Sequence, residues 1–328
     1  MNMKKTYVVL LLLLSQMAFS QDGIPVYSDY LSDNLYLLHP SMAGAASYNQ
    51  VRLTARSQWG GVEDAPKMQT LNYNTRVGES SAIGAIFFND KNGYHSQTGG
   101  YLTYAHHLKF SRSDADLNQL SFGISFGLIQ SRLDETNFDP EDFDPIIAGI
   151  IQSSSYFNID AGVSYNFLNF SSHFTIKNII FQNRKINDEG YESNNQRKYL
   201  ISAAYAIGQN GATWTYEPSF LVQFAESSGE QAFDINFKAY RKMDFGRLWG
   251  ALSYRRSLDG AEYVGGTQKL QYITPIVGIN FNKFMFAYTY SIQTGEVKFD
   301  GGYHQITLGF NFLGGRDAPY ECNCPAIN

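Results

Sequence analysis

The feature that most limits how this chain can fold is a strict alternation of large apolar and small or polar side chains near its C-terminal end. After His304, the even-numbered positions up to Phe312 carry Ile, Leu, Phe and Phe, and the odd-numbered positions carry Gln, Thr, Gly and Asn. The run from Phe284 to Ile292 has Phe, Tyr or Ile at every even-numbered position. Because a period of two places successive side chains on opposite faces of a β-strand, both runs predict strands with one apolar face.

The same alternation continues through almost all of the chain after Val51 and predicts about fourteen strands. The predicted strands are 51–59, 68–77, 82–88, 98–110, 117–129, 156–168, 172–181, 198–207, 213–224, 232–240, 247–255, 269–281, 284–292 and 303–312. A soluble sandwich would also alternate, but here aromatic residues crowd the apolar faces, and only 17 % of residues are charged, against about 25 % in soluble domains. We therefore predict an all-β fold, a transmembrane β-barrel of antiparallel strands that leaves no unpaired edge in lipid.

The lengths of the predicted links between strands support the barrel independently. Long links alternate with short ones: the long links are 89–96, 132–155, 183–196, 257–268 and 293–302, and the short links are 78–81, 169–171, 209–212, 243–245 and 282–283. Outer-membrane barrels have long extracellular loops, short periplasmic turns and, with an even number of strands, both termini in the periplasm. We therefore predict an outer-membrane location with periplasmic termini.

The N-terminal end has the pattern of a secretory signal peptide. Lys4 and Lys5 precede an apolar run that is too short to span a bilayer, and small residues stand three and one positions before Gln21. We assign residues 1–20 to a signal peptide, 21–50 to a non-barrel segment that plugs the lumen or packs at the periplasmic mouth, 51–312 to the barrel, and 313–328 to a periplasmic tail.

Charged residues are expected to line the lumen rather than to form a catalytic site. The alternation along the predicted strands places several charged side chains on the face toward the lumen. They are Arg52, Arg56, Lys109, Asp160, Lys177, Glu217, Asp234 and Lys238. Mixed charges inside a barrel usually pair with one another or are solvated. The formal net charge of −5 includes no basic block, so we expect no nucleic-acid partner.

No residue pattern in the sequence indicates catalysis. The chain has no nucleophile elbow, phosphate loop or metal-binding helix motif, and His106 and His107 are adjacent, so they point to opposite faces of a strand. The two cysteines, Cys322 and Cys324, lie in the tail, where a zinc site would need further ligands. We therefore expect no enzymatic activity, no cofactor and no metal.

An acidic loop between two predicted strands is a candidate extracellular docking surface. Its residues of interest are Asp134, Glu135, Phe138, Asp139, Pro140, Asp142, Phe143, Asp144 and Pro145. The tripeptide Phe-Asp-Pro occurs twice in it, and the prolines favour a defined loop shape. Calcium, which prefers several oxygen ligands, is an alternative, although the spacing is not that of an EF-hand.

Several motifs resemble those of the PorP/SprF family of the type IX secretion system in Bacteroidetes. The family motif Asn-Pro-Ala-x-Ala-Gly is similar to the six residues that end at Gly44, and the family motif Arg-x-Gln-Trp with a following Ala-Pro pair comes next. The repeated Phe-Asp-Pro and the last strand also resemble the family, so the resemblance covers essentially the whole mature chain. The matching motif residues are His39, Pro40, Gly44, Arg56, Gln58, Trp59 and Pro66.

The resemblance implies an outer-membrane component associated with type IX secretion and, in gliding bacteria, with surface adhesins. Such a protein would bind a particular secreted surface protein or adhesin, through the C-terminal secretion domain of that partner, and would hold it at the cell surface. It would also engage periplasmic secretion or motor components. The alternative is a channel or transporter for hydrophobic solutes, since about fourteen strands can surround a plugged lumen.

Physical reasoning gives the motif residues a structural role. Pro40 and Gly44 would fix a turn before the first strand. Arg56 and Gln58 would hold that turn from inside the barrel by hydrogen bonds, and Trp59 would anchor the barrel at the membrane interface. The alternative that stays open is that Arg56 and Trp59 contact the secreted partner.

Overall fold

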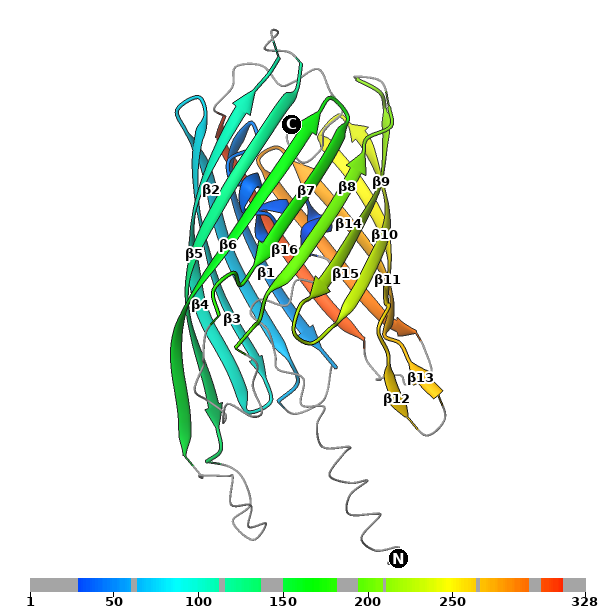
Figure 1. Ribbon diagram of the computed structural model, residues 1–328. Helices are drawn as coiled ribbons and strands as arrows, with labels where there is room; N and C mark the ends of the chain where they lie inside the picture. Colours follow the sequence, from blue (N-terminus) through cyan, green and yellow to red (C-terminus); the bar gives the residue numbers. More distant parts are fainter. Residues whose placement is uncertain are drawn as a thin grey trace, which may run out of the picture.

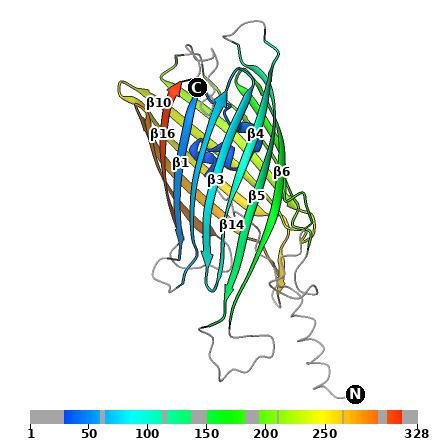
Figure 2. The same cartoon turned by 90° about the vertical axis from the view of Figure 1, so that its left-hand side faces the viewer.

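The computed structural model describes residues 29–59, 64–111, 116–136, 150–181, 194–208, 211–263, 266–294 and 302–314. Its main element is one antiparallel sheet of fourteen strands, closed into a barrel by the pairing of the first strand with the last (Figures 1 and 2). A separate short hairpin, formed by β12 (Ala261–Tyr263) and β13 (Gly266–Gln268), stands at one end of the barrel. The predicted closed barrel is therefore confirmed.

Each of the fourteen predicted strands overlaps one strand of the barrel, because the period of two in the sequence matches the pleat of the sheet. The predicted strand 172–181 extends past the end of β7 at Lys177, and β3 continues to Asn92 beyond its predicted end at 88. The barrel strands are β1 (Tyr48–Gln58), β2 (Lys67–Val77), β3 (Ser81–Asn92), β4 (His95–Lys109), β5 (Asn118–Asp134), β6 (Ile151–Phe167), β7 (Phe170–Lys177), β8 (Lys198–Tyr205), β9 (Trp214–Ala225), β10 (Gln231–Met243), β11 (Gly246–Ser257), β14 (Gln271–Phe281), β15 (Phe284–Thr294) and β16 (Tyr303–Gly314).

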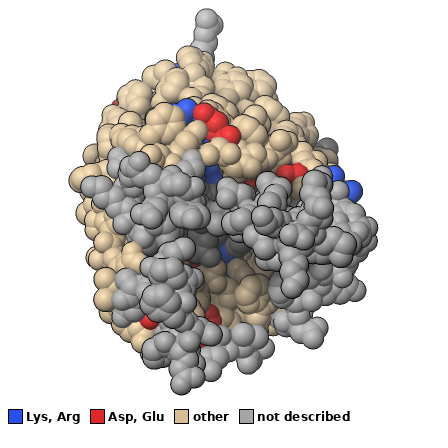
Figure 3. All heavy atoms as spheres, turned by 60° about the horizontal axis from the view of Figure 1, so that its bottom comes forward, with Lys and Arg blue, Asp and Glu red and all other residues tan. Residues whose placement is uncertain are grey.

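The two faces of the sheet differ in the way that a membrane requires. On β15, Met285, Ala287 and Thr289 are buried in the lumen, whereas Phe284 and Phe286 face outward with exposed fractions of 61 % and 44 %. Figure 3 looks toward the end with the longer links and shows few charged side chains on the described outer wall. An apolar exterior around a polar interior is the arrangement of a barrel whose outer surface meets lipid.

The two ends of the barrel have different links. At the short-turn end, only positions 282–283 separate β14 from β15, and 168–169 separate β6 from β7. The opposite, long-loop end carries the longest links, and two of its links are short, at 93–94 and 226–230. The link expected at 89–96 is a tight turn at Gly93 and Tyr94, because polar residues at the ends of β3 and β4 continue to pair across the hairpin. Short turns mark the periplasmic end and long loops the extracellular end.

The wall of the barrel has unequal height at the long-loop end. Strands β5 and β6 have 17 residues each, whereas β7 and β8 have 8 each. As a result, the β5–β6 hairpin projects beyond β7 and β8 (Figure 1). The pairing of β6 with β7 ends at Ala161 opposite Ile176, although β6 continues for ten more residues to Ile151.

Residues 29–47, which we call the plug, lie inside the barrel (Figure 1). They contain three short 3-10 helices, η1 (Asp29–Ser32), η2 (Leu35–Leu37) and η3 (Pro40–Met42). Helix η3 contacts β4, β5 and β6, and the apolar side chains of the plug join clusters on the inner wall. In the part of the chain that the structure describes, no helix has the length and apolar character needed to cross a membrane.

Some predictions concern residues outside the described ranges. The expected signal peptide, residues 1–20, is among them, and so are residues 315–328 of the expected tail, which include both cysteines. The described chain begins at Asp29 within the lumen and ends at Gly314, the last residue of β16, at the short-turn end. The domain boundaries at 20 and 312 therefore stay predictions.

Candidate functional site

The first half of the plug is held by charged side chains. The Asp33 carboxylate accepts hydrogen bonds from the Lys238 ammonium at 2.5 Å and from the Tyr240 hydroxyl at 2.9 Å. The Glu217 carboxylate lies 3.9 Å from the same ammonium. Burial works to raise the pKa of the Asp33 carboxyl, but the Lys238 charge and the two hydrogen bonds outweigh it and hold this pKa below its usual value. Asp33 is therefore ionised and ties the plug to β10.

A second ionic contact lies nearer the long-loop end. The Tyr30 hydroxyl donates to Asp234 at 2.9 Å, and the Asn236 amide donates to the Tyr30 oxygen at 2.9 Å. The Arg255 guanidinium binds both oxygens of Asp234, at 2.6 and 2.8 Å. The predicted pairing of lumen charges is confirmed for these groups, whereas Lys109 is exposed at the periplasmic end of β4.

His39 is fully buried where the plug crosses β7 and β8. Its Nδ1 is 2.8 Å from the Thr175 hydroxyl and its Nε2 is 3.0 Å from the Ser202 hydroxyl, while its ring stacks on His173 at 4.8 Å between centroids. Burial lowers the pKa of the His39 imidazole, and the neighbouring His173 and Lys177 lower it further. The ring is therefore neutral, with one nitrogen that donates and one that accepts.

Pro40 and Ser41 lie against a pair of glycines in the wall. Gly123 of β5 and Gly162 of β6 are directly opposite each other in the sheet, and we call them the glycine platform. A Cβ on Gly123 would lie 2.3 Å from the Pro40 carbonyl carbon. The Ser41 hydroxyl forms a hydrogen bond of 2.6 Å with a serine hydroxyl of β6. Glycine within a strand often marks a close approach of another backbone, and here that backbone belongs to the plug.

The plug ends in a turn at Gly44, near the short-turn end of the barrel. Gly44 has φ +61°, which favours glycine. Its N–H donates to Asn74 Oδ1 at 2.9 Å, and its carbonyl accepts from Arg76 Nε at 3.0 Å. The His107 ring, through Nε2, is 3.0 Å from the Ala43 carbonyl. Three side chains of β2 and β4 therefore hold this turn.

The remaining motif residues lie at the opposite end of β1, on the long-loop rim. Arg56 is buried against the wall, with its guanidinium carbon 5.6 Å from the centre of the Tyr303 ring. The Gln58 N–H donates to the Pro66 carbonyl at 3.0 Å, and the Trp59 N–H donates to a carbonyl of the β15–β16 link at 3.0 Å. Gln58, Trp59 and Tyr303 help to line a cavity of about 60 Å³ at this rim.

The family motif is thus divided between two places. On β1, Arg56 stands six residues beyond Gln50, which pairs with Asn74 beside the plug turn. Six residues of a strand correspond to about 20 Å. The hypothesis that Arg56 and Gln58 hold the turn at Gly44 is therefore wrong.

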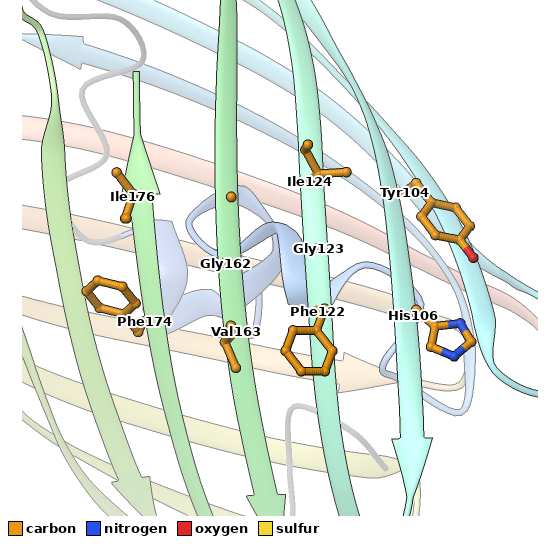
Figure 4. Close-up of a pocket in the computed structure, with 10 residues that line it drawn as sticks. Tyr104, His106, Phe122, Gly123, Ile124, Gly162, Val163, Phe174 and Ile176 are labelled. Carbon is orange, nitrogen blue, oxygen red and sulfur yellow. The ribbon is translucent and has the colours of Figure 1, made fainter. Parts of the chain in front are cut away.

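The outer wall is hollowed behind the glycine platform. Figure 4 shows Phe122, Val163 and Phe174 around this groove and the ribbon of the plug behind Gly123 and Gly162. The groove has a volume of about 350 Å³ and a nearly apolar lining. On the membrane-facing surface of a barrel, such a lining is suited to the hydrocarbon chains of outer-membrane lipid.

Of the predicted acidic docking loop, the structure describes Asp134 and Glu135. The Asp134 carboxylate is 3.3 Å from the Arg132 guanidinium and accepts from the Thr136 hydroxyl and N–H at 2.6 and 3.2 Å. Glu135 is buried and accepts from a side-chain amide of β6 at 3.0 Å. The residues at 138–145 lie outside the described ranges. Within those ranges, no group of His, Cys, Asp and Glu is placed to hold a metal ion.

Sequence reasoning missed the contacts that seat the plug. Gly123 and Gly162 are absent from the predicted site residues, although a glycine inside a strand is itself a signal of close backbone approach. Gly84 gives the same signal, since a Cβ there would lie 2.4 Å from the Tyr36 hydroxyl. Asp33 was a weaker indication of a contact with the wall, because it is an acidic residue in a segment that was expected to be enclosed.

Together these features define a class of protein. A closed sheet with an apolar exterior, a polar lumen and an internal plug is the architecture of an outer-membrane β-barrel. The model of one family, described as type IX secretion system membrane protein PorP/SprF, matches residues 19–310. The chain belongs to this family, whose fold is that of a non-enzymatic outer-membrane barrel. No curated protein sequence matches the chain.

The chain is similar to solved structures of several other outer-membrane proteins. The TodX monoaromatic hydrocarbon channel, as a deltaS2 mutant, is 10 % identical with a TM-score of 0.48, covering 85 % of this chain and 92 % of that one. An outer membrane channel from Pseudomonas putida F1 is 11 % identical, with a TM-score of 0.41 and coverages of 81 % and 96 %. BamA from Haemophilus ducreyi lacking POTRA domains 1-3 is 10 % identical, with a TM-score of 0.41 and coverages of 80 % and 70 %.

Proposed function

We propose that this barrel holds a secreted surface protein or gliding adhesin at the cell surface and links it to type IX secretion or motor components in the periplasm. Membership of the family supports the association with secretion. The observation that carries the proposal is the plug, which is bound to the wall on both sides of the lumen. A barrel filled in this way presents two docking faces rather than an open pathway.

The packing around the plug favours docking over the alternative of a solute channel. Where Asp33 and Lys238 meet the wall, a cavity of about 50 Å³ lies beside the plug. That volume is enough for a few water molecules and too small for a passing solute. Opening a path would require the buried ion pairs of the plug to break, and separating a buried pair leaves an uncompensated charge.

The two ends of the barrel would bind different partners. At the extracellular end, the projecting β5–β6 hairpin, the acidic loop between its strands and the Trp59 rim form the proposed docking face. The partner would bind there through its C-terminal secretion domain. At the periplasmic end, we propose that residues 313–328 contact the secretion or motor components.

A native pull-down from solubilised envelopes tests the proposal. Mass spectrometry should identify a large secreted protein and, with it, periplasmic components of the secretion machinery. A strain that lacks the gene should lose that protein from the cell surface. An unchanged set of surface proteins would reject the docking function. Conductance in liposomes, appearing when residues 29–47 are deleted and accompanied by solute uptake in the full chain, would instead support the channel.

A further inference from the structure

An open sheet edge lies at the long-loop end, where β6 extends beyond the end of β7. The pairing of β6 with β7 ends at Ala161, and one further hydrogen bond between backbone groups joins the Ile179 N–H to the Ile159 carbonyl at 2.8 Å. Side chains make two more contacts there, from the Asn178 N–H to Asp160 and from the Asn158 amide to Asn178. On its other side, β6 pairs with β5 over its whole length. Among the described residues, no strand pairs with the outer side of β6 at positions 151–158, which we call the β6 edge.

The direction of the free backbone groups follows from the register. The N–H and C=O of one strand residue point to the same side, and successive residues point to opposite sides. The Ile159 carbonyl faces β7, and the Ile150 carbonyl faces β5, where it accepts from the Glu135 N–H at 3.2 Å. Odd-numbered residues therefore present their backbone groups to the open side. These residues, whose side chains are exposed, are Ile151, Ser153, Ser155 and Phe157.

The β6 edge lies outside the membrane. A tilted strand of a barrel crosses the bilayer in about 9–11 residues, so a span that begins near Phe167, at the short-turn end, is complete near Phe157. Unpaired backbone groups are not tolerated where they face lipid. The edge therefore begins where the membrane ends and faces the extracellular space.

The composition of the edge leaves it able to pair. Natural proteins usually block an exposed edge with lysine, proline or a bulge. Positions 151–158 read Ile-Gln-Ser-Ser-Ser-Tyr-Phe-Asn, with no charged residue and no proline. Their register with β5 also runs without interruption. An unblocked, regular edge of this length is a template for the addition of an extended segment as a new strand.

A second copy of this chain in the same membrane cannot supply that strand. Two copies inserted in the same direction are related by a rotation about the membrane normal. Barrel strands are tilted by about 35–45°, so any such rotation takes the two β6 strands out of alignment. Without rotation, the open side of one β6 faces the side of the other that is already bonded to β5. A second copy is therefore excluded as the source of the strand.

We propose that the β6 edge receives an extended, uncharged strand of the secreted protein that this barrel holds. The strand would add to the barrel sheet outside the membrane and would carry apolar side chains opposite Ile151 and Phe157. Small side chains would stand opposite Ser153 and Ser155. This inference rests on the proposed function and adds to it the mode of binding and the chemistry of the partner segment.

Amide hydrogen exchange resolved to single residues tests the proposal on the purified barrel and on the complex isolated by the pull-down. In the barrel alone, the Ser153 and Ser155 amides should exchange freely, whereas the Gln152 and Ser154 amides, bonded to β5, should be protected. In the complex, exchange at Ser153 and Ser155 should slow by about tenfold or more, as expected when hydrogen bonds form.

Three results would overturn the proposal, and they separate it from the proposed function. Protection of Ser153 and Ser155 in the barrel alone would show that another part of this chain covers the edge. A retained partner that leaves both amides unprotected would reject strand addition while the docking function stands. If no partner is retained by the wild-type barrel, the docking function and the strand addition are both rejected.

A pair of variants at one position provides the matched control. Ser155→Pro removes an N–H that points to the open side and breaks no hydrogen bond to β5, and Ser155→Ala keeps that N–H. Ser155→Pro should lower the amount of retained partner about tenfold, and Ser155→Ala should leave it unchanged. Heat-modifiable migration on a gel verifies folding. If the proline variant does not insert, Ser153→Lys blocks the same edge. Equal retention of the partner by the blocking variant and by Ser155→Ala would overturn the proposal.

Discussion

The two halves of the plug are attached to the same barrel by different interactions. The first half, at Tyr30 and Asp33, is bound through buried carboxylates, an ammonium and a guanidinium on β10 and β11. The second half, from His39 to Gly44, is bound by neutral hydrogen bonds and by close backbone contact with the glycine platform. The first attachment therefore depends on charge balance, and the second depends on shape and on a neutral imidazole.

This difference predicts that the two halves can be released separately. A buried charge that loses its partner is costly, whereas a neutral hydrogen bond contributes about 1 kcal/mol. The four predictions below run from the largest expected effect to the smallest. Each one acts on one half of the plug or, in the last case, on a site remote from both.

The largest loss of stability is expected from Lys238→Met. This substitution leaves the Asp33 and Glu217 carboxylates buried without the ammonium, which costs about 3–5 kcal/mol. The thermal midpoint of unfolding, followed by heat-modifiable migration, should fall accordingly. The double variant Asp33→Asn with Lys238→Met should recover part of the loss, because it removes one of the stranded charges. A single variant as stable as the wild type would show that charge does not hold the first half.

A smaller loss is expected from Gly123→Ala on the other half of the plug. The added Cβ would lie 2.3 Å from the Pro40 carbonyl carbon, and overpacking of this kind typically costs about 1–3 kcal/mol. The same unfolding measurement applies. Gly250→Ala is the matched control, since the nearest atom to its Cβ would be 3.6 Å away. Equal stability of the two variants would mean that the plug is not seated on the glycine platform.

Acid should loosen the second half of the plug and leave the first half in place. The pKa of His39 lies below the usual value of about 6.5, so the released plug binds a proton that the docked plug excludes. The stability of docking is therefore lost as the pH falls, by about 2 kcal/mol between pH 6.5 and 5. The pKa of Asp33 is itself lowered, so the first half should hold through this interval.

Amide exchange within residues 39–44, compared with residues 30–33, measures this pH effect. His39→Asn, which places the residue of the family motif at this position, should weaken the dependence on pH between 6.5 and 5. Part of the dependence should remain, because the buried His173 and His107 also contact this half of the plug. Faster exchange in both halves at once would show that the plug leaves the lumen as one unit, and would contradict the separate release of its two halves. No change in exchange at residues 39–44 would show that His39 does not control docking.

The smallest effect on the plug is expected from Trp59→Ala. Trp59 lies at the long-loop rim, at the other end of β1 from the plug turn, so plug docking should change by less than about 0.5 kcal/mol. If Trp59 is an interfacial anchor, the variant should insert less well and still retain the secreted partner once inserted. Normal insertion with loss of the partner in the pull-down would instead assign Trp59 to the docking face.

Most of the fold could be predicted from the sequence because strand patterning is local. Alternation along β15 and β16 reports directly which side chains face lipid, and the same rule located every barrel strand. The link at 89–96 was the exception. Its polar residues resembled a loop, but Asn89 pairs with Thr98 across the hairpin, and such cross-strand pairing leaves no local mark on the sequence.

The candidate site was harder to predict because it is assembled from distant parts of the chain. The sequence pointed to His39, Pro40 and Gly44 and to the inward charges Asp234 and Lys238. It did not indicate that Asp33 meets Lys238, 205 positions away, or that Pro40 meets Gly123. The motif Arg-x-Gln-Trp resembled a continuation of the plug site, although the length of β1 carries it to the opposite end of the barrel.

By itself, the sequence determined the closed barrel, its apolar exterior and its family, since each of these follows from local periodicity or from short motifs. Only the tertiary structure decided how the plug is divided between an ionic and a neutral attachment, and where β6 extends beyond the end of β7. Both outcomes depend on strand register and on which side chains meet across the lumen. These relations join residues far apart in the chain, so no local pattern encodes them.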